Sequence, residues 1–315
     1  MRNTFVNTLC ELAEQDERVW LLCGDLGYSV LERFATRYPN RYINVGVAEQ
    51  NMVGVAAGLA LSGKVVFTYS IANFPVMRCL EQIRNDVCYH NLNVKTVAVG
   101  AGLPYGTHGY THHGVEDIAV MRAFPNMTVV APGDPVETKL ATAALLAHDG
   151  PGYLRLGKGG EPTIHQVDPG FQIGRALSLR EGDDATIIAT GAILAEAAKA
   201  VDLLAEQGIH AGLLSMPTIQ PLDTEAVLRA ARTPLIVTVE EHRPVGGLGS
   251  AVAETLADEP QSRARLIRCG VTISPKIVGS GAYLRERNHL DAAHLAQTVA
   301  QALAPVTPAT PVVRR

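Results

Sequence analysis

Continuous apolar runs, most of them followed closely by a glycine, an aspartate or a proline, recur along the first half of the chain. They cover residues 19–22, 65–69, 94–99 and 127–131. A strand that is apolar at nearly every position is typical of a parallel sheet covered on both faces. Segments with helical spacing lie between these runs, over residues 4–14, 49–61, 74–90 and 135–147. We therefore expect an α/β fold with a doubly wound parallel sheet.

A second series of the same kind follows, with apolar runs over residues 185–189, 211–215 and 235–239. Helical spacing accompanies these runs over residues 194–207, 224–231, 250–257 and 292–303. The stretch between the two series is rich in glycine and proline, and 315 residues are enough for two domains. We predict a first domain over residues 1–165, a linker over 166–184, a smaller doubly wound domain over 185–304 and a disordered tail over 305–315.

The charge and the cysteine content exclude several classes of protein. With 27 basic and 31 acidic residues, the chain lacks the positive excess that nucleic-acid binding by counterion release needs. The apolar runs fall well short of the ~20 residues of a membrane span, and we expect no signal peptide. Five scattered cysteines without a CxxC pair are typical of reduced thiols, so we expect a cytoplasmic protein.

One acidic residue opens a helix of small residues. The sequence Gly-Val-Ala-Glu-Gln at 46–50 leads into a segment with glycine or alanine at positions 54, 56, 57, 58 and 60. Small side chains let a neighbouring backbone approach closely, which predicts a buried helix with Glu49 at its start, where the helix dipole favours a negative charge. Glu49 is therefore a candidate functional acid, although an ordinary acid of a first helical turn fits the same spacing.

Three histidines lie in a glycine-containing loop after the apolar run at 94–99. They are His108, His112 and His113, and α/β proteins place ligand sites beyond the carboxyl ends of their strands. The spacing of His108 and His112 permits zinc binding, but neither an HExxH motif nor a cysteine partner supports it. Proton transfer or oxyanion binding by imidazole is the preferred interpretation, with a solvated loop as the alternative.

Two further segments carry glycines next to possible anion ligands. Arg155 and Lys158 stand on an extended segment that ends in glycines, which suits a phosphorylated or carboxylated substrate. The sequence Gly-Gly-Leu-Gly-Ser at 246–250 leads into a helix whose N-terminus could bind an anion. Close packing of this loop on a helix is the preferred interpretation.

The residues by themselves indicate an α/β enzyme of two domains with an acid and a histidine loop.

These motifs, taken in order, resemble the C-terminal half of the transketolase family of thiamine diphosphate enzymes. The resemblance rests on Gly-Asp-Leu at 24–26, the Glu49 segment, Thr-His-His at 111–113, residues 127–135, and Glu-Glu-His-x-x-x-Gly-Gly-Leu-Gly at 240–249. It extends over most of the chain, to about residue 303. It implies a pyrimidine-binding domain followed by a smaller transketolase C-terminal domain, which suits the layers predicted above.

The resemblance implies a role for Glu49 toward the cofactor. Glu49 matches the glutamate that hydrogen-bonds a ring nitrogen of the aminopyrimidine, favours its imino tautomer and so helps to deprotonate the thiazolium carbon. The family also stacks an aromatic ring on the pyrimidine, and residues 69–74 depart from the family's spacing there. Phe74 and Tyr69 are both candidates for this ring, with a core position as the alternative for either.

The resemblance also implies contacts with substrate. His112 matches a histidine of the substrate channel, and we expect it to assist proton movement on the sugar hydroxyls. His108 stands where single-chain transketolases usually carry an aspartate that reads sugar stereochemistry, which leaves the sugar open. The other substrate-binding residues that we expect are His113, Ser29, Arg155 and Lys158, of which Lys158 lies near the family's phosphate-binding arginine.

One family motif has no counterpart in this sequence. In the family, the diphosphate and magnesium are held by a Gly-Asp-Gly segment followed further along the chain by an asparagine, and nothing here fits it. The resemblance therefore implies a partner, an N-terminal subunit that carries the diphosphate-binding domain. It also implies an α2β2 assembly in which each active site lies between protomers, and we assign no metal ligand to this chain.

The implied activity is transfer of a two-carbon ketol unit from a ketose phosphate to an aldose or its phosphate. A beta subunit of a 2-oxo acid dehydrogenase shares this domain pair, and a deoxyxylulose phosphate synthase is similar in this half. The sequence Gly-x-Thr-His-His at 109–113 favours sugars over 2-oxo acids. A non-catalytic assembly subunit is a further alternative, against which Glu49 and the histidine loop argue.

Overall fold

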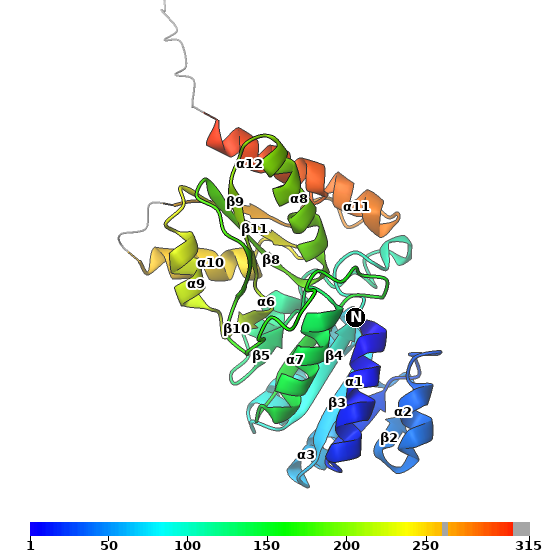
Figure 1. Cartoon of the computed structure of the whole chain (residues 1–315). Helices are drawn as coiled ribbons and strands as arrows, with labels where there is room; N and C mark the ends of the chain where they lie inside the picture. The colour runs from blue at the N-terminus through cyan, green and yellow to red at the C-terminus, as the bar shows by residue number, and fades with distance from the viewer. Residues whose placement is uncertain (260–263, 305–315) are drawn as a thin grey trace, which may run out of the picture.

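The computed structural model describes residues 1–259 and 264–304 (Figure 1). It shows two α/β units packed together, each a sheet with its helices, which we call the first and the second layer. The tail predicted over 305–315 lies outside the described residues. No helix in the described part of the chain is long and apolar enough to cross a membrane. The predicted α/β class is confirmed, since both layers contain a largely parallel sheet with helices on its two faces.

The first layer is a seven-stranded sheet of order β10-β5-β6-β4-β3-β1-β2. Its strands are Val19–Cys23 (β1), Tyr42–Asn44 (β2), Val65–Ile71 (β3), Val94–Val99 (β4), Thr128–Val130 (β5), Gly152–Leu156 (β6) and Thr218–Gln220 (β10). All neighbouring pairs are parallel except β10 with β5. The four predicted runs correspond to β1, β3, β4 and β5, whose side chains are almost all buried.

Helices cover both faces of this sheet (Figure 1). One face packs against α1 (Arg2–Gln15), α2 (Glu32–Arg37) and α7 (Pro135–Ala147). The other packs against α3 (Glu49–Leu61), α4 (Asn73–Met77), α5 (Leu80–Gln82), the π-helix η2 (Ile83–Cys88) and α6 (Asp117–Arg122). The start predicted for α7 is confirmed, because the Asp134 carboxylate accepts a hydrogen bond from the Glu137 backbone N–H and Pro135 is the first helical residue.

The single helix predicted over 74–90 is wrong. The chain forms α4, α5 and η2 instead, and it leaves the helical region at Cys79, where φ is −112° and ψ is 15°. The Cys79 side chain is buried in the core, so packing overrides the helical periodicity of the sequence at this point. The break separates α4, which carries Phe74, from the rest of the predicted helix.

The second layer is a five-stranded sheet of order β12-β11-β8-β9-β7. Its strands are Leu177–Arg180 (β7), Ala185–Thr190 (β8), Ala211–Ser215 (β9), Leu235–Glu240 (β11) and Arg265–Cys269 (β12). One face packs against α8 (Leu194–Glu206), α11 (Gly281–Arg287) and α12 (Ala292–Leu303), and the other against α9 (Thr224–Ala230) and α10 (Leu248–Ala257). Three short 3₁₀ helices complete the described chain: Pro39–Arg41 (η1), Gly106–His108 (η3) and Gly191–Ile193 (η4).

Two antiparallel edge strands change the predicted division of the chain. β7 lies inside the linker predicted over 166–184, yet it pairs with β9 in the second sheet. β10 lies inside the domain predicted over 185–304, yet it pairs with β5 in the first sheet. The chain therefore crosses back to the first sheet before it completes the second, and the two layers are joined by more than one connection.

Candidate active site

Glu49 is the first residue of α3, and its side chain is only 4% exposed. The turn before it is fixed by Asn44, whose side-chain oxygen accepts hydrogen bonds from the backbone N–H groups of Asp25 and Gly46, each at 3.0 Å. Gly24 packs against the acid, because a Cβ atom there would lie 3.4 Å from the Glu49 Cγ atom. The predicted buried acid at a helix start is thus present, and the positive end of α3 stabilises its charge.

Three further side chains form a chain of contacts that begins at this acid, and we call the four residues the Glu49 cluster. The Arg78 Nη1 atom donates to the Glu49 Oε1 atom at 3.0 Å, and the Arg78 guanidinium carbon lies 4.1 Å from the centre of the Phe74 ring. The His112 ring contacts the Phe74 ring edge-on, with 5.1 Å between their centres. The structure therefore brings together Glu49, Phe74 and His112, which lie far apart in the sequence.

Tyr69 does not belong to this cluster: of the two positions predicted for it, beside the cofactor or in the core, the structure places it in the core. Its side chain is 2% exposed and stacks on Phe5, with ring centres 6.1 Å apart, in the core beneath α1. Burial raises the pKa of its hydroxyl group. Tyr69 is a core residue, whereas Phe74 is half-buried on the other side of the sheet and contacts Arg78, the ion-pair partner of Glu49.

The histidine loop is held closed at its base and presents two imidazoles. The backbone N–H of Gly102 donates to the carbonyl of Gly114 at 2.8 Å. His113 is buried, and its Nε2–H donates to the carbonyl of Gly106 at 3.2 Å, so its ring supports the loop. His108 is exposed and His112 half-buried, with 5.0 Å between their ring centres.

The surroundings of His112 favour its neutral form. Burial is the main cause that lowers the pKa of His112, and the neighbouring His108, His113 and Arg78 lower it further. A neutral imidazole at pH 7 can accept a proton from a hydroxyl group, which suits the predicted role in proton movement. Its Nδ1 atom lies 3.0 Å from the Thr111 hydroxyl oxygen, which orients the ring.

Of the other predicted substrate residues, Lys158 lies close to the histidine pair and Ser29 lies on a separate loop. The Lys158 ammonium group is 4.6 Å from the centre of the Tyr105 ring, which in turn contacts both His108 and His112. Ser29 is exposed in the loop after β1, and its φ of 62° is a left-handed conformation that is uncommon for serine. Its backbone N–H donates to the carboxylate of Glu32 at 2.7 Å.

Arg155 is not available to a substrate, and its prediction as a phosphate ligand is wrong. Its side chain is 4% exposed, and its Nε atom donates to the buried carboxylate of Asp117 at 2.7 Å. Its Nη2 atom donates to the carbonyls of Gly114 and Glu241 at 2.8 and 2.9 Å. Burial is the largest single influence and opposes the charge of Asp117, but Arg155 together with His242 and the Tyr153 hydroxyl group outweighs it, so the pKa of that carboxyl group is lowered.

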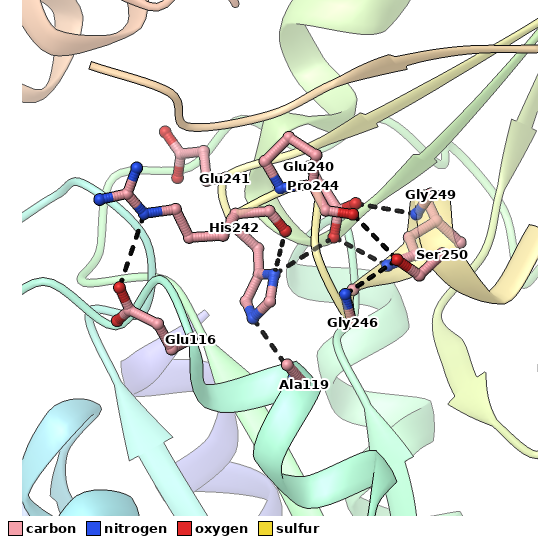
Figure 2. Close-up of polar contacts among 12 residues, drawn as sticks. Glu116, Ala119, Glu240, Glu241, His242, Pro244, Gly246, Gly249 and Ser250 are labelled. Carbon is pink, nitrogen blue, oxygen red and sulfur yellow. Dashed lines mark hydrogen bonds and ion pairs between the residues drawn. The ribbon is translucent and has the colours of Figure 1, made fainter. Parts of the chain in front are cut away.

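Arg155 and Asp117 belong to a larger set of buried polar groups between the two layers, which we call the domain-joining cluster: Asp117, Arg155, Glu240, Glu241 and His242. Figure 2 shows the part of this cluster around Glu240 and His242, where the Glu240 carboxylate accepts a hydrogen bond from the backbone N–H of Gly249 at 2.8 Å. The same carboxylate accepts from the backbone N–H of Leu248, also at 2.8 Å. His242 donates from Nδ1 to the carbonyl of Arg243 at 2.6 Å and accepts at Nε2 from the Ala119 N–H of α6 at 3.3 Å.

The glycine-rich loop at 246–250 packs closely on a helix, as preferred from the sequence. A Cβ atom at Gly246 would come within 2.4 Å of the Ala119 Cβ atom of α6, so only glycine fits there. The N-terminus of α10 is occupied by the carboxylate of Glu240 from the same chain (Figure 2). It is therefore closed to an external anion.

In the described part of the chain, one group of side chains has a spacing suited to a metal ion: Asp134, Glu137 and His165. Its ligand atoms are already used by the protein. The Asp134 carboxylate accepts from the backbone N–H groups of Glu137, Ile164 and His165, and Glu137 accepts from His165 Nε2 at 2.8 Å and from the Gly133 N–H. These contacts fasten the segment after β6 to the start of α7.

Sequence reasoning missed Arg78 and Asp117. Arg78 follows Phe74 by four residues, a spacing that places two side chains on one side of a helix, and this signal could have found it. Asp117 stands at the end of the histidine loop motif, but its partner Arg155 is 38 residues away in the sequence. No local spacing could have indicated that pair.

Two family models match the chain. The model described as "Transketolase, pyrimidine binding domain" matches residues 1–161, and "Transketolase, C-terminal domain" matches residues 174–280. The 6-deoxy-6-sulfo-D-fructose transketolase subunit SqwH of Clostridium sp. (strain MSTE9) is 44% identical over 294 residues, which cover 93% of this chain and 91% of that protein. An apulose-4-phosphate transketolase subunit of Phocaeicola vulgatus is 43% identical over 262 residues, covering 82% and 84%.

A solved structure described as "Split gene transketolase, inactive beta4 tetramer" is also similar. It is 38% identical, superposes with a TM-score of 0.88, and covers 96% of this chain and 97% of that chain. The similarity therefore extends across both layers, as the motifs predicted. The chain belongs to the transketolase family, of which it carries the pyrimidine-binding domain followed by the C-terminal domain.

Proposed function

We propose that this chain is one subunit of a split, thiamine diphosphate-dependent transketolase and supplies the pyrimidine side of its active site. The observation that carries the proposal is the Glu49 cluster, in which a buried carboxylate and the face of a half-buried aromatic ring both contact the same guanidinium group, that of Arg78. A flat heteroaromatic ring with nitrogen atoms at its edge needs these two groups, a carboxyl partner for the edge and a π surface for the face.

The cofactor fits the residues present. Glu49 would hold a ring nitrogen of the aminopyrimidine and share a proton with it, and Phe74 would stack on its face. When bound, thiamine diphosphate supplies a thiazolium carbon that can stabilise a carbanion. His112 would accept or donate a proton at a substrate hydroxyl, and its lowered pKa suits the accepting role.

The substrate we propose is a ketose phosphate, from which a two-carbon ketol unit passes to an aldose or its phosphate. His108 and Lys158 lie on one side of His112, around the Tyr105 ring, and present groups that bind anions and hydroxyls. Arg155 takes no part in this, since its donors are used inside the protein. Sugar phosphates as substrates suit an enzyme of the cytoplasm.

The diphosphate and magnesium would be bound mainly by a partner chain, an N-terminal subunit, in an α2β2 complex. Relatives of the same span are named as subunits of transketolases, which supports a two-chain enzyme. The similar solved structure is titled as an inactive tetramer of beta chains, which supports the need for another chain. In the described residues, the acidic group at Asp134 and Glu137 uses its oxygens within the protein.

Reconstitution tests this proposal. The chain alone, the partner alone and the co-purified pair are assayed with thiamine diphosphate and magnesium, with a ketose phosphate as donor and an aldose phosphate as acceptor. We expect two-carbon transfer only by the pair. Transfer from pyruvate instead of the ketose phosphate would favour a deoxyxylulose phosphate synthase or a 2-oxo acid dehydrogenase. A pair that binds the cofactor but transfers nothing from any donor would contradict a catalytic role.

A further inference from the structure

Arg78 makes two contacts that a bound aminopyrimidine would also need. Its guanidinium group lies over the Phe74 ring, 4.1 Å from the ring centre, and it donates to the Glu49 Oε1 atom at 3.0 Å. Arg78 follows the last residue of α4, one helical turn beyond Phe74. That spacing lets both side chains reach the same side of the helix, next to the start of α3.

A guanidinium group and an aminopyrimidine ring have the same recognition features. Both are flat and delocalised, both present N–H donors along an edge, and both stack on an aromatic face. They therefore compete for the same carboxylate and for the same ring. We infer that Arg78 is a placeholder that occupies the pyrimidine position when no cofactor is bound and leaves it when the aminopyrimidine enters. This inference rests on the proposed function, which assigns Glu49 and Phe74 to the pyrimidine.

The burial of the two partners is unequal, which determines which one moves. The Arg78 side chain is 47% exposed and the Glu49 side chain 4% exposed. When Arg78 withdraws, its charge goes into water, whereas Glu49 stays on α3 and needs a new hydrogen-bond partner. The ion pair thus compensates for the buried carboxylate in the empty site, and a half-exposed pair is weak enough for a ligand to break.

Calorimetric titration of thiamine diphosphate, with magnesium present, into the assembled two-chain complex tests the inference. Removing the competitor in Arg78→Ala should tighten cofactor binding by about three- to tenfold. Arg78→Lys keeps the charge without the flat stacking group and should lie between wild type and Arg78→Ala. If Arg78→Ala fails to assemble, Arg78→Lys carries the test, again by tighter binding than wild type.

Two matched variants identify the cause of any change. Arg84→Ala removes another exposed arginine, which contacts Asn85 rather than Glu49, and should bind the cofactor as wild type does. Phe74→Leu removes the stacking surface and should weaken binding. If Arg78→Ala binds the cofactor more tightly and Arg84→Ala does not, the cause is the vacated pyrimidine position and not the loss of one positive charge. A merely structural role for Arg78 would not tighten cofactor binding.

The outcomes distinguish this inference from the proposed function. If the wild-type complex binds the cofactor and Arg78→Ala binds it equally or more weakly, the placeholder role is overturned and the proposed function stands. If the wild-type complex binds no thiamine diphosphate at all, both are overturned. Tighter binding by Arg84→Ala of the same size as by Arg78→Ala would also overturn the placeholder role, because the effect would then not be specific to the pyrimidine position.

Discussion

The Glu49 cluster and the domain-joining cluster contain the same kinds of side chain in opposite situations. In the domain-joining cluster, the guanidinium of Arg155 and the carboxylate of Asp117 are both buried, and the chain supplies their partners. In the Glu49 cluster, a buried carboxylate is paired with the half-exposed Arg78. The difference teaches that charge and burial alone do not mark a functional residue. A buried acid whose partner is free to leave is the one available to a ligand.

The largest effect that can test this comparison is the loss of stability on removing Arg155. Arg155→Met leaves the Asp117 carboxylate buried without its cation and should lower the free energy of unfolding by about 3–5 kcal/mol. Lys158→Met, a matched change of a half-buried cation on the same segment, should stay within about 0.5 kcal/mol of wild type. Urea unfolding followed by circular dichroism measures both.

Substrate kinetics complete that experiment. Lys158→Met should raise KM for the sugar phosphate while the protein remains stable, because Lys158 lies beside the histidine pair. An Arg155→Met protein with wild-type stability and a raised KM would contradict the comparison, because Arg155 would then be a substrate ligand after all.

A smaller effect concerns pH, because two groups of the domain-joining cluster have opposite pH dependences. Burial raises the pKa of Glu240 from 4.5 to about 7, so its contribution to stability decreases as pH rises from 4.5 to 7. Burial lowers the pKa of His242 from 6.5 to about 4, so its contribution increases as pH rises from 4 to 6.5. Between pH 4.5 and 6.5 the contributions of Glu240 and His242 to the free energy of unfolding therefore change in opposite directions.

Glu240→Gln should reveal the pH dependence of stability that is due to His242. Its unfolding temperature should fall more steeply than that of wild type when the pH is lowered from 6.5 to 4.5. The destabilising effect of His242 remains over this range, whereas the opposing effect of Glu240 is gone. Calorimetric unfolding scans at several pH values measure the difference, with Glu14→Gln as a control on an exposed acid. Parallel curves for Glu240→Gln and wild type would show that the two buried groups do not act in this way.

Much of the fold could be predicted because it depends on local patterns. Runs of consecutive apolar residues identified the central strands, and the capping residues Asp134 and Pro135 placed the start of α7. The edge strands β7 and β10 were missed because they are short and pair antiparallel with distant segments. The break at Cys79 was missed because it comes from burial of that side chain in the core.

The candidate site was only partly predictable, for a similar reason. Glu49 and the histidine loop lie in recognisable motifs, so their residue numbers could be given in advance. Tyr69 and Phe74 are both aromatic and five residues apart, and only the structure shows that they lie on different sides of the sheet. Arg155 looks like a surface cation until Asp117 is seen beside it.

The measurement that tests the central claim most directly is the turnover and stability of Glu49→Gln in the assembled two-chain complex. Gln keeps the shape of the side chain but removes the carboxylate that would share a proton with the cofactor, so turnover should fall by at least about a hundredfold. The complex should still assemble and unfold at the wild-type temperature, and Glu14→Gln should retain full turnover. Near-normal turnover by Glu49→Gln would contradict the assignment of Glu49 as the acid that faces the cofactor.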